Sequence, residues 1–289
     1  MRWRGERQSD NIEDRRGLRL GRPGLAAGGL GTVAIVVIGM MLGVDPGVLL
    51  QGLQQGGEAT GPATQTAAPY EESADESERR QFVAVVLADT EAVWQQLFRA
   101  RGGTYREPRL VLFSDTVQSG CGYAEAAMGP FYCPADDRVF LDMSFFDEMS
   151  GRLEAGGDFA RAYVIAHEVG HHVQNLLGAS GKVHEMQQRV GRVEANQLSV
   201  RLELQADCYA GVWANRAEQN RAMLESGDLE EAMGAASAVG DDRLQRQARG
   251  RVVPDSFTHG SSEQRMRWFR RGFQDGDPEA CDTFAAADL

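Results

Sequence analysis

Residues 158–177 read DFARAYVIAHEVGHHVQNLL, and this stretch decides the fold. The apolar residues before the first histidine favour a buried helix, which Asp158 can cap at its start and Gly178 can end. His167 and His171 are four residues apart, so they lie on one face of that helix, one turn from each other. Two imidazoles in this relation can coordinate a single zinc ion. We therefore predict a long helix that carries two metal ligands.

Glu168 follows the first of these ligands and reaches the same side of the metal. A carboxylate there can take a proton from a zinc-bound water, which then attacks a polarised carbonyl group. His172 points about 100° away from His171, so we predict no ligand role for it. The simpler alternative is a pair of histidines on a helix face near acids, without a metal.

A catalytic zinc needs a third protein ligand and an open fourth position. The pattern HExxHxxGxxH, which supplies a third histidine, fails because Gln174 and Leu177 stand at the required positions. Glu203 is the better candidate, four residues before Asp207 in the apolar run RLELQADCYAGVW (residues 201–213). Buried acids need a partner, so we predict Glu203 as the third ligand and Asp207 as the group that orients a ligating histidine. The competing side chains lie in a more polar stretch: His184, Glu185 and Glu194.

An arginine-rich segment and then an uncharged one precede this region. Residues 1–22 hold seven arginines and four acids, whereas residues 24–44 hold no charged residue. About 20 apolar residues in a helix cross the ~30 Å core of a bilayer, and the arginine-rich side stays in the cytoplasm. We therefore predict a cytoplasmic segment at residues 1–23 and a retained signal anchor at residues 24–44, with everything after Asp45 outside. A cleavable signal peptide and a buried core helix are the alternatives.

The rest of the chain divides into a linker and one domain. Residues 45–77 are rich in Gly, Gln, Thr, Ala and acids, which is typical of a flexible linker. In the domain, residues 78–289, periodicity predicts an amphipathic helix over 78–101, strands over 109–113 and 138–145, and mainly helices further on. The fold class is therefore α+β, mainly helical with a small β-sheet. A formal net charge of −12 argues against a nucleic-acid partner.

The four cysteines bear on the compartment. No CxxC pair is present, so a zinc ribbon or a thioredoxin-type site is disfavoured. An even number in an exported domain indicates two disulfides, whereas a cytosolic domain would favour four buried free thiols. The residues are Cys121, Cys133, Cys208 and Cys281.

Several separate segments resemble the bacterial neutral zinc metallopeptidases, a family of single-pass membrane proteins. They are the opening MRWRGERQSDNIEDRRG, then GPFYCPADDRVFLD, AYVIAHEVGHHVQ, LSVRLELQADCYAGVW, FTHGSSEQRMRWF and the ending CDTF. The resemblance covers most of the chain. It implies a zincin-like metallopeptidase domain after a single transmembrane helix, one Zn²⁺ per chain, and a protein or peptide substrate.

A wider group also looks similar: membrane-bound heat-shock and prenyl-protein proteases with HExxH, then ExxxD, then Thr-His followed by arginine. Thr258, His259 and Arg265 match the last element. The resemblance implies that His259 stabilises the oxyanion of the tetrahedral intermediate, although a helix cap near Ser261 is the alternative. The stretch 139–144 resembles the edge strand that pairs with extended substrates in such enzymes.

The cysteine pairing that we expect joins Cys121 to Cys133, just before that strand, and Cys208 to Cys281, tying the C-terminal tail to the second ligand helix. Four cysteines allow three connectivities, so the other pairings stay open.

The predicted function is hydrolysis of peptide bonds by a membrane-anchored zinc metallopeptidase, single-pass in the cell membrane, with an extracytoplasmic catalytic domain. Two alternatives remain: a non-catalytic, zinc-stabilised membrane protein that binds a partner, and a zinc amidase acting on the cell wall. Glu168 discriminates against the first, because a structural site has no use for a carboxylate there and closes its fourth position with protein. The sequence indicates neither the physiological substrate nor the oligomeric state.

Overall fold

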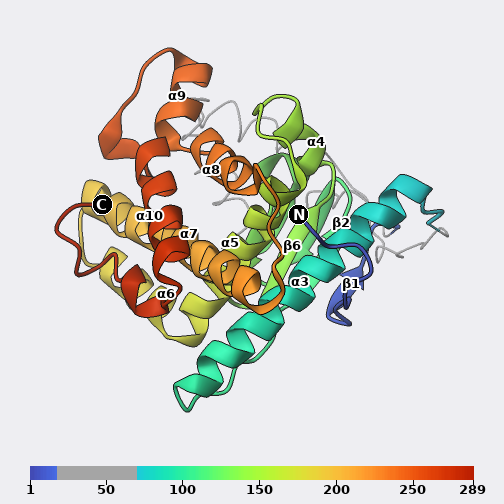
Figure 1. Ribbon diagram of the computed structural model, residues 1–289. Helices are drawn as coiled ribbons and strands as arrows, with labels where there is room; N and C mark the ends of the chain where they lie inside the picture. Colours follow the sequence, from blue (N-terminus) through green and yellow to red (C-terminus); the bar gives the residue numbers. More distant parts are fainter. Residues whose placement is uncertain (18–69) are drawn as a thin grey trace, which may run out of the picture. The chain divides into compact units, whose positions relative to one another are not determined.

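The computed structural model describes residues 1–17 and 70–289, in which helices predominate over a small sheet (Figure 1). Residues 1–16 and 70–289 belong to one compact unit. The strands are β1 (Ile12–Asp14), β2 (Arg109–Phe113), β3 (Thr116–Ser119), β4 (Gly122–Glu125), β5 (Phe131–Cys133) and β6 (Arg138–Asp142). The helices are α3 (Ala74–Ala100), α4 (Phe145–Ser150), α5 (Asp158–Leu176), α6 (Ala179–Gln187), α7 (Arg192–Arg221), α8 (Asp228–Ala238), α9 (Asp241–Arg249) and α10 (Ser262–Asp275). The predicted α+β class, mainly helical with a small sheet, is confirmed.

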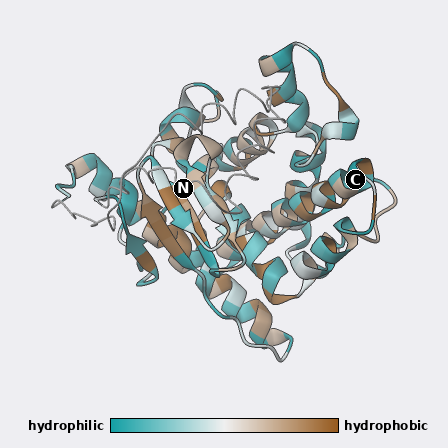
Figure 2. Cartoon of the chain, turned by 180° about the vertical axis from the view of Figure 1, so that it is seen from behind, coloured by the Kyte–Doolittle hydropathy of each residue, from teal (hydrophilic) through white to brown (hydrophobic). Residues whose placement is uncertain are grey.

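The main sheet has the strand order β1-β2-β6-β5. β1, β2 and β6 are parallel, and β5 pairs antiparallel with β6 at one edge. Leu110, Val111 and Leu112 of β2 are fully buried because the strand has a hydrophobic cluster on each face, and Figure 2 shows hydrophobic residues along the strands. The interpretation of residues 139–144 as an edge strand is wrong, since β6 lies inside the sheet and β5 forms the edge.

The first 16 residues are part of the folded domain. β1 aligns Ile12 with Leu110 in the sheet, and Trp3 packs edge-on against Phe82 with ring centroids 5.4 Å apart. Residues 1–16 therefore do not form a separate segment, as the predicted division at residues 1–23 required. A strand of three residues is too short to show an alternating pattern, which is why the sequence did not predict it.

The N-terminus also contacts the start of α5. The α-ammonium group of Met1 lies 2.9 Å from Asp158 Oδ1 and 3.3 Å from Asp228 Oδ1. Together with Glu231, these two acids form a cluster of carboxylates, and the ammonium group supplies a positive charge beside it. The segment thus helps to fix the beginning of the helix that carries the HEVGH motif.

The predicted membrane span at residues 24–44 and most of the predicted linker lie outside the described residues. Among the helices that the structure describes, none has the length and apolarity to span a bilayer.

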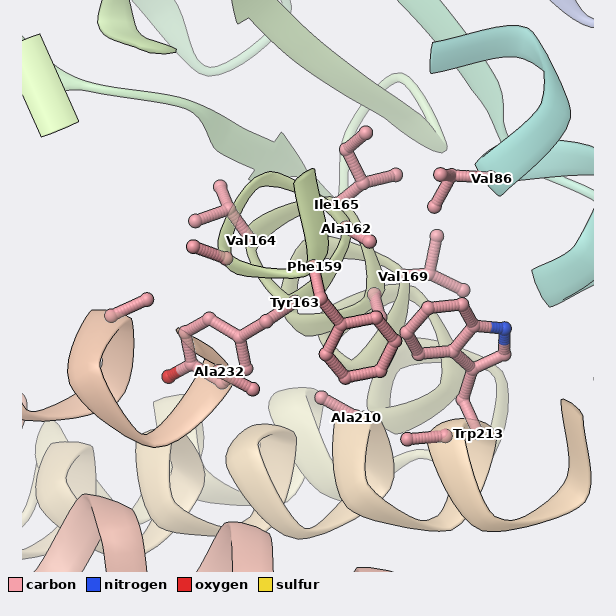
Figure 3. Packing of buried hydrophobic residues seen from close by; sticks show 14 of the residues in the cluster. Val86, Phe159, Ala162, Tyr163, Val164, Ile165, Val169, Ala210, Trp213 and Ala232 are labelled. Atoms are coloured by element: carbon pink, nitrogen blue, oxygen red, sulfur yellow. The ribbon is translucent and has the colours of Figure 1, made fainter. Parts of the chain in front are cut away.

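The helical layer packs around α5, α7 and α10. Phe159 of α5 stacks on Trp213 of α7 with ring centroids 5.8 Å apart (Figure 3). α7 and α10 cross at two glycines, where added Cβ atoms would collide with backbone: at Gly211 with the carbonyl oxygen of Phe269, and at Gly272 with that of Cys208. This close crossing places the second half of α10 against the middle of α7.

Both expected disulfides are present. Cys121–Cys133 joins the turn between β3 and β4 to the edge strand β5, and Cys208–Cys281 joins α7 to the C-terminal tail. The described residues contain no free cysteine.

Candidate metal centre

Two helices supply the predicted metal-binding residues. α5 carries the HEVGH motif, and α7 carries Glu203 and Asp207. The helices approach closely at Gly170, where a Cβ atom would lie 3.0 Å from the carbonyl oxygen and 3.1 Å from the Cα atom of Ala206. The glycine of the motif therefore lets the second helix come near enough for its carboxylates to reach the histidines.

The three predicted ligands meet at one point. His167 Nε2 lies 3.2 Å from Glu203 Oε2, and His171 Nε2 lies 3.4 Å from Glu203 Oε1. Two atoms bound about 2.0–2.2 Å from one zinc ion at the tetrahedral angle are about 3.4 Å apart. Although burial favours the neutral acid, the two histidines hold the pKa of Glu203 well below its usual value. The donor types and their spacing fit a zinc ion.

Asp207 contacts Nδ1 of His167, whereas Nε2 of the same ring faces Glu203. Asp207 Oδ1 accepts hydrogen bonds from His167 Nδ1 at 2.8 Å and from the Tyr163 hydroxyl at 2.5 Å. Arg265 donates through Nε to Oδ2 at 2.8 Å and through Nη2 to Oδ1 at 2.9 Å. Although burial opposes ionisation, Arg265 and His167 lower the pKa of Asp207. These contacts have the geometry that the predicted orienting role requires.

Glu168 faces an open cavity. The cavity has a volume of about 580 Å³, and its lining includes Glu168, His259 and the three predicted ligands. Burial raises the pKa of the Glu168 carboxyl. A raised pKa brings a carboxyl nearer to neutral pH, where it can both accept and release a proton.

His259 reaches the same cavity from the loop before α10. The backbone N–H groups of Thr258, His259 and Gly260 donate to Asp241 Oδ2 at 2.7, 2.7 and 3.1 Å. The His259 side chain is about half exposed, with Nδ1 3.4 Å from Asp241 Oδ1. Burial lowers the pKa of His259, but the carboxylates of Asp241 and Glu203 together outweigh this effect and raise it. Ser261 is the N-cap of α10, so His259 does not cap this helix.

Three residues of this arrangement were not predicted. Tyr163 is four residues before His167 and hence on the same helix face, a signal that the spacing offered. Gln174 lies three residues after His171, and in the sequence it shows only that the HExxHxxGxxH pattern is absent. Asp241 lies 18 residues from His259, and no local pattern links the two.

The fold brings two histidines of α5 and one glutamate of α7 together as a group that could hold a metal ion, with a second carboxylate beside it. The chain belongs to the family described as "Putative neutral zinc metallopeptidase", whose profile matches residues 1–284.

The chain is similar to two bacterial proteins over most of its length. The chain is 51% identical over 292 residues to YpfJ of Escherichia coli K12, covering 98% of this chain and 99% of YpfJ. It is 43% identical over 262 residues to Rv2575 of Mycobacterium tuberculosis H37Rv, covering 86% of each chain. No solved structure matches the chain.

Proposed function

We propose that this protein is a zinc-dependent metallopeptidase that hydrolyses peptide bonds in proteins or peptides, with one zinc ion per chain held by His167, His171 and Glu203. The observation that carries the proposal is that ligand atoms of these three residues lie within 4.8 Å of one another, beside a buried carboxyl group that lines a cavity. The bound ion supplies a Lewis acid and lowers the pKa of the attacking water.

Glu168 is the general base in this proposal. Its carboxylate takes a proton from the attacking water and returns it to the amide nitrogen that leaves, so the proton balance closes within one residue. The raised pKa of Glu168 suits both steps.

His259 is the proposed donor to the oxyanion. Asp241 fixes the backbone of its loop and lies behind Nδ1, which leaves Nε2 for the cavity. Arg265 cannot take this role, because its guanidinium group is buried and engaged by Asp207.

A purely structural metal site is disfavoured. In the described part of the chain, the ligand cluster contains three residues and no fourth histidine, cysteine or carboxylate. Structural zinc sites are closed by four protein ligands, whereas catalytic sites keep one position for water or substrate.

The edge strand β5 is the proposed docking element for an extended substrate. It is antiparallel to β6, and Phe131 and Tyr132 line the cavity together with the metal-binding residues. Main-chain pairing with such an edge provides affinity that depends little on side chains. This arrangement also supports a zincin-like fold.

We propose further that residues 24–44 attach the protein to a membrane and that the catalytic domain lies outside the cytoplasm. The uncharged, largely apolar run supports attachment, and the proposal does not include a single crossing because residues 1–16 and 70–289 belong to one unit. The two disulfides support the second statement, since such bonds persist in oxidising compartments.

The decisive experiment compares the purified full-length protein with its Glu168→Gln variant on a peptide library in the presence of zinc. The full chain is needed because residues 78–289 alone would lack β1. We expect zinc content to be unchanged and the cleavage rate to fall by about 10²–10⁴-fold. Equal cleavage by both proteins, or zinc-independent cleavage by the wild type, would contradict the proposal.

A further inference from the structure

Gln174 lies one turn beyond His171 on α5 and is fully buried. His171 Nδ1 lies 2.9 Å from Gln174 Oε1. Gln174 Nε2 donates to the carbonyl oxygen of Leu202 at 2.7 Å and to Gln205 Oε1 at 3.1 Å. The amide thus joins the metal helix α5 to the backbone of α7, one residue before Glu203.

Backbone carbonyl groups fix the direction of every hydrogen bond in this chain of amides. Gln205 Nε2 lies 3.0 Å from the carbonyl oxygen of Cys281, and a carbonyl oxygen only accepts. Gln205 therefore turns its own Oε1 toward Gln174, which must donate to it and to Leu202. This leaves Gln174 Oε1 for His171.

The orientation of Gln174 decides the tautomer of His171. Because Gln174 Oε1 can only accept, His171 Nδ1 carries the proton. In the neutral form of this tautomer the free lone pair is on Nε2, the nitrogen that lies 3.4 Å from Glu203 Oε1. That nitrogen is the one that a metal ion would meet.

We propose that Gln174 is a positioning residue that fixes the Nδ1–H tautomer and the ring orientation of His171. It is the neutral counterpart of Asp207, which holds His167 in the same way. Asp207 is balanced by Arg265, and the uncharged Gln174 needs no such counterion. The inference rests on the proposed zinc site, because positioning matters for function only if His171 binds a metal.

The first test measures zinc affinity by competition with a chromophoric chelator. Gln174→Met keeps the volume of the side chain and removes its acceptor, and we expect zinc affinity to fall by about 10–100-fold. Gln174→Glu keeps an oxygen that accepts from Nδ1 but loses the two bonds that Nε2 donates, so the protein should be less stable while its zinc affinity falls less than that of Gln174→Met. The matched control is Gln187→Met, because Gln187 also joins two helices through Ala195 and Ser199 but touches no predicted ligand.

The second test needs no zinc. In the zinc-free wild type, ¹⁵N spectra of the histidine rings should show His171 protonated on Nδ1, and Gln174→Met should lose this preference. A merely structural glutamine would not change the tautomer.

The outcomes separate this inference from the proposed function. An Nε2–H tautomer in the wild type, an unchanged affinity in a folded Gln174→Met protein, or an equal loss in Gln187→Met overturns the role of Gln174. A wild type that binds no zinc overturns the proposed function instead, and the ¹⁵N spectra then still decide the role of Gln174. Should Gln174→Met fail to fold, the wild-type tautomer and the affinity of Gln174→Glu decide it.

Discussion

At the scale of single residues, the site depends on buried hydrogen-bond partners behind the metal-facing atoms. Asp207 receives hydrogen bonds from three different side chains, one of them a bidentate arginine. A buried carboxylate tolerates loss of its solvent shell only when such partners replace it. These partners position Asp207, and through it the His167 ring, in a way that the HEVGH motif alone does not.

Tyr163→Phe tests the contribution of one such partner. The change removes the hydroxyl that donates to Asp207 at 2.5 Å and leaves the ring in place. Since a hydrogen bond to a charged group contributes about 1.5–3 kcal/mol, we expect the free energy of unfolding in urea to fall by that amount. Tyr209→Phe is the control, because Tyr209 is also in the core, where its ring packs edge-on against Trp94. Equal losses in both variants would show that the Asp207 contact adds nothing specific.

At the scale of secondary structure, the long helices were predictable and the short strands were not. The helix at 158–177 and the strand at 109–113 match α5 and β2 closely, because the first is long and rich in apolar residues and the second is a continuous apolar run. β1 and β5 have three residues each, too few to show a period. The edge role that the resemblance implies for residues 139–144 belongs to β5 instead, because sheet order depends on contacts between distant segments.

The same limit applies to the site. The ligand spacings within α5 and α7 follow from helix geometry, and the structure brings those residues together. The link between Asp241 and His259 depends on a loop that packs back onto α9, which no local pattern encodes.

Gly170→Ala tests how closely two helices must approach to form the site. Alanine favours an isolated helix by about 1 kcal/mol over glycine, but here its Cβ would lie 3.0 Å from the backbone of Ala206. We expect overpacking to destabilise the protein by about 1–3 kcal/mol and zinc affinity to fall, because Glu203 lies on the helix that is pushed away. Thermal unfolding and zinc titration measure the two effects.

Gly234→Ala is the matched control for that change. Gly234 lies within α8 with no atom within 4 Å of an added Cβ, so we expect a gain in stability of up to about 1 kcal/mol and unchanged zinc affinity. A Gly170→Ala protein that behaved like Gly234→Ala would contradict the role assigned to the close approach.

At the scale of the whole molecule, the packing of residues 1–16 constrains membrane topology. β1 is hydrogen-bonded within the sheet, and Arg16 pairs with Glu72 at 2.7 Å, so the chain leaves and re-enters the domain at one place. A single crossing by the intervening residues would put β1 on one side of the membrane and the other three strands of this sheet on the other side. We therefore propose a different topology from the predicted one, which combined a cytoplasmic segment at residues 1–23 with an extracytoplasmic domain.

We expect residues 1–16 and the catalytic domain to lie on the same side of the membrane, and outside the cytoplasm if the disulfides form in cells. Single cysteines at Arg4 and at Met128, whose side chains are exposed, can be labelled in intact cells with a membrane-impermeant maleimide. Both positions should react before lysis and to a similar extent, because one folded unit contains both. If Met128→Cys reacted in intact cells and Arg4→Cys reacted only after lysis, the two positions would lie on opposite sides of the membrane. That result would contradict the pairing of β1 with β2 in the membrane-bound protein. Labelling of both only after lysis would keep the shared side and place the whole domain in the cytoplasm, against the compartment that the two disulfides indicate.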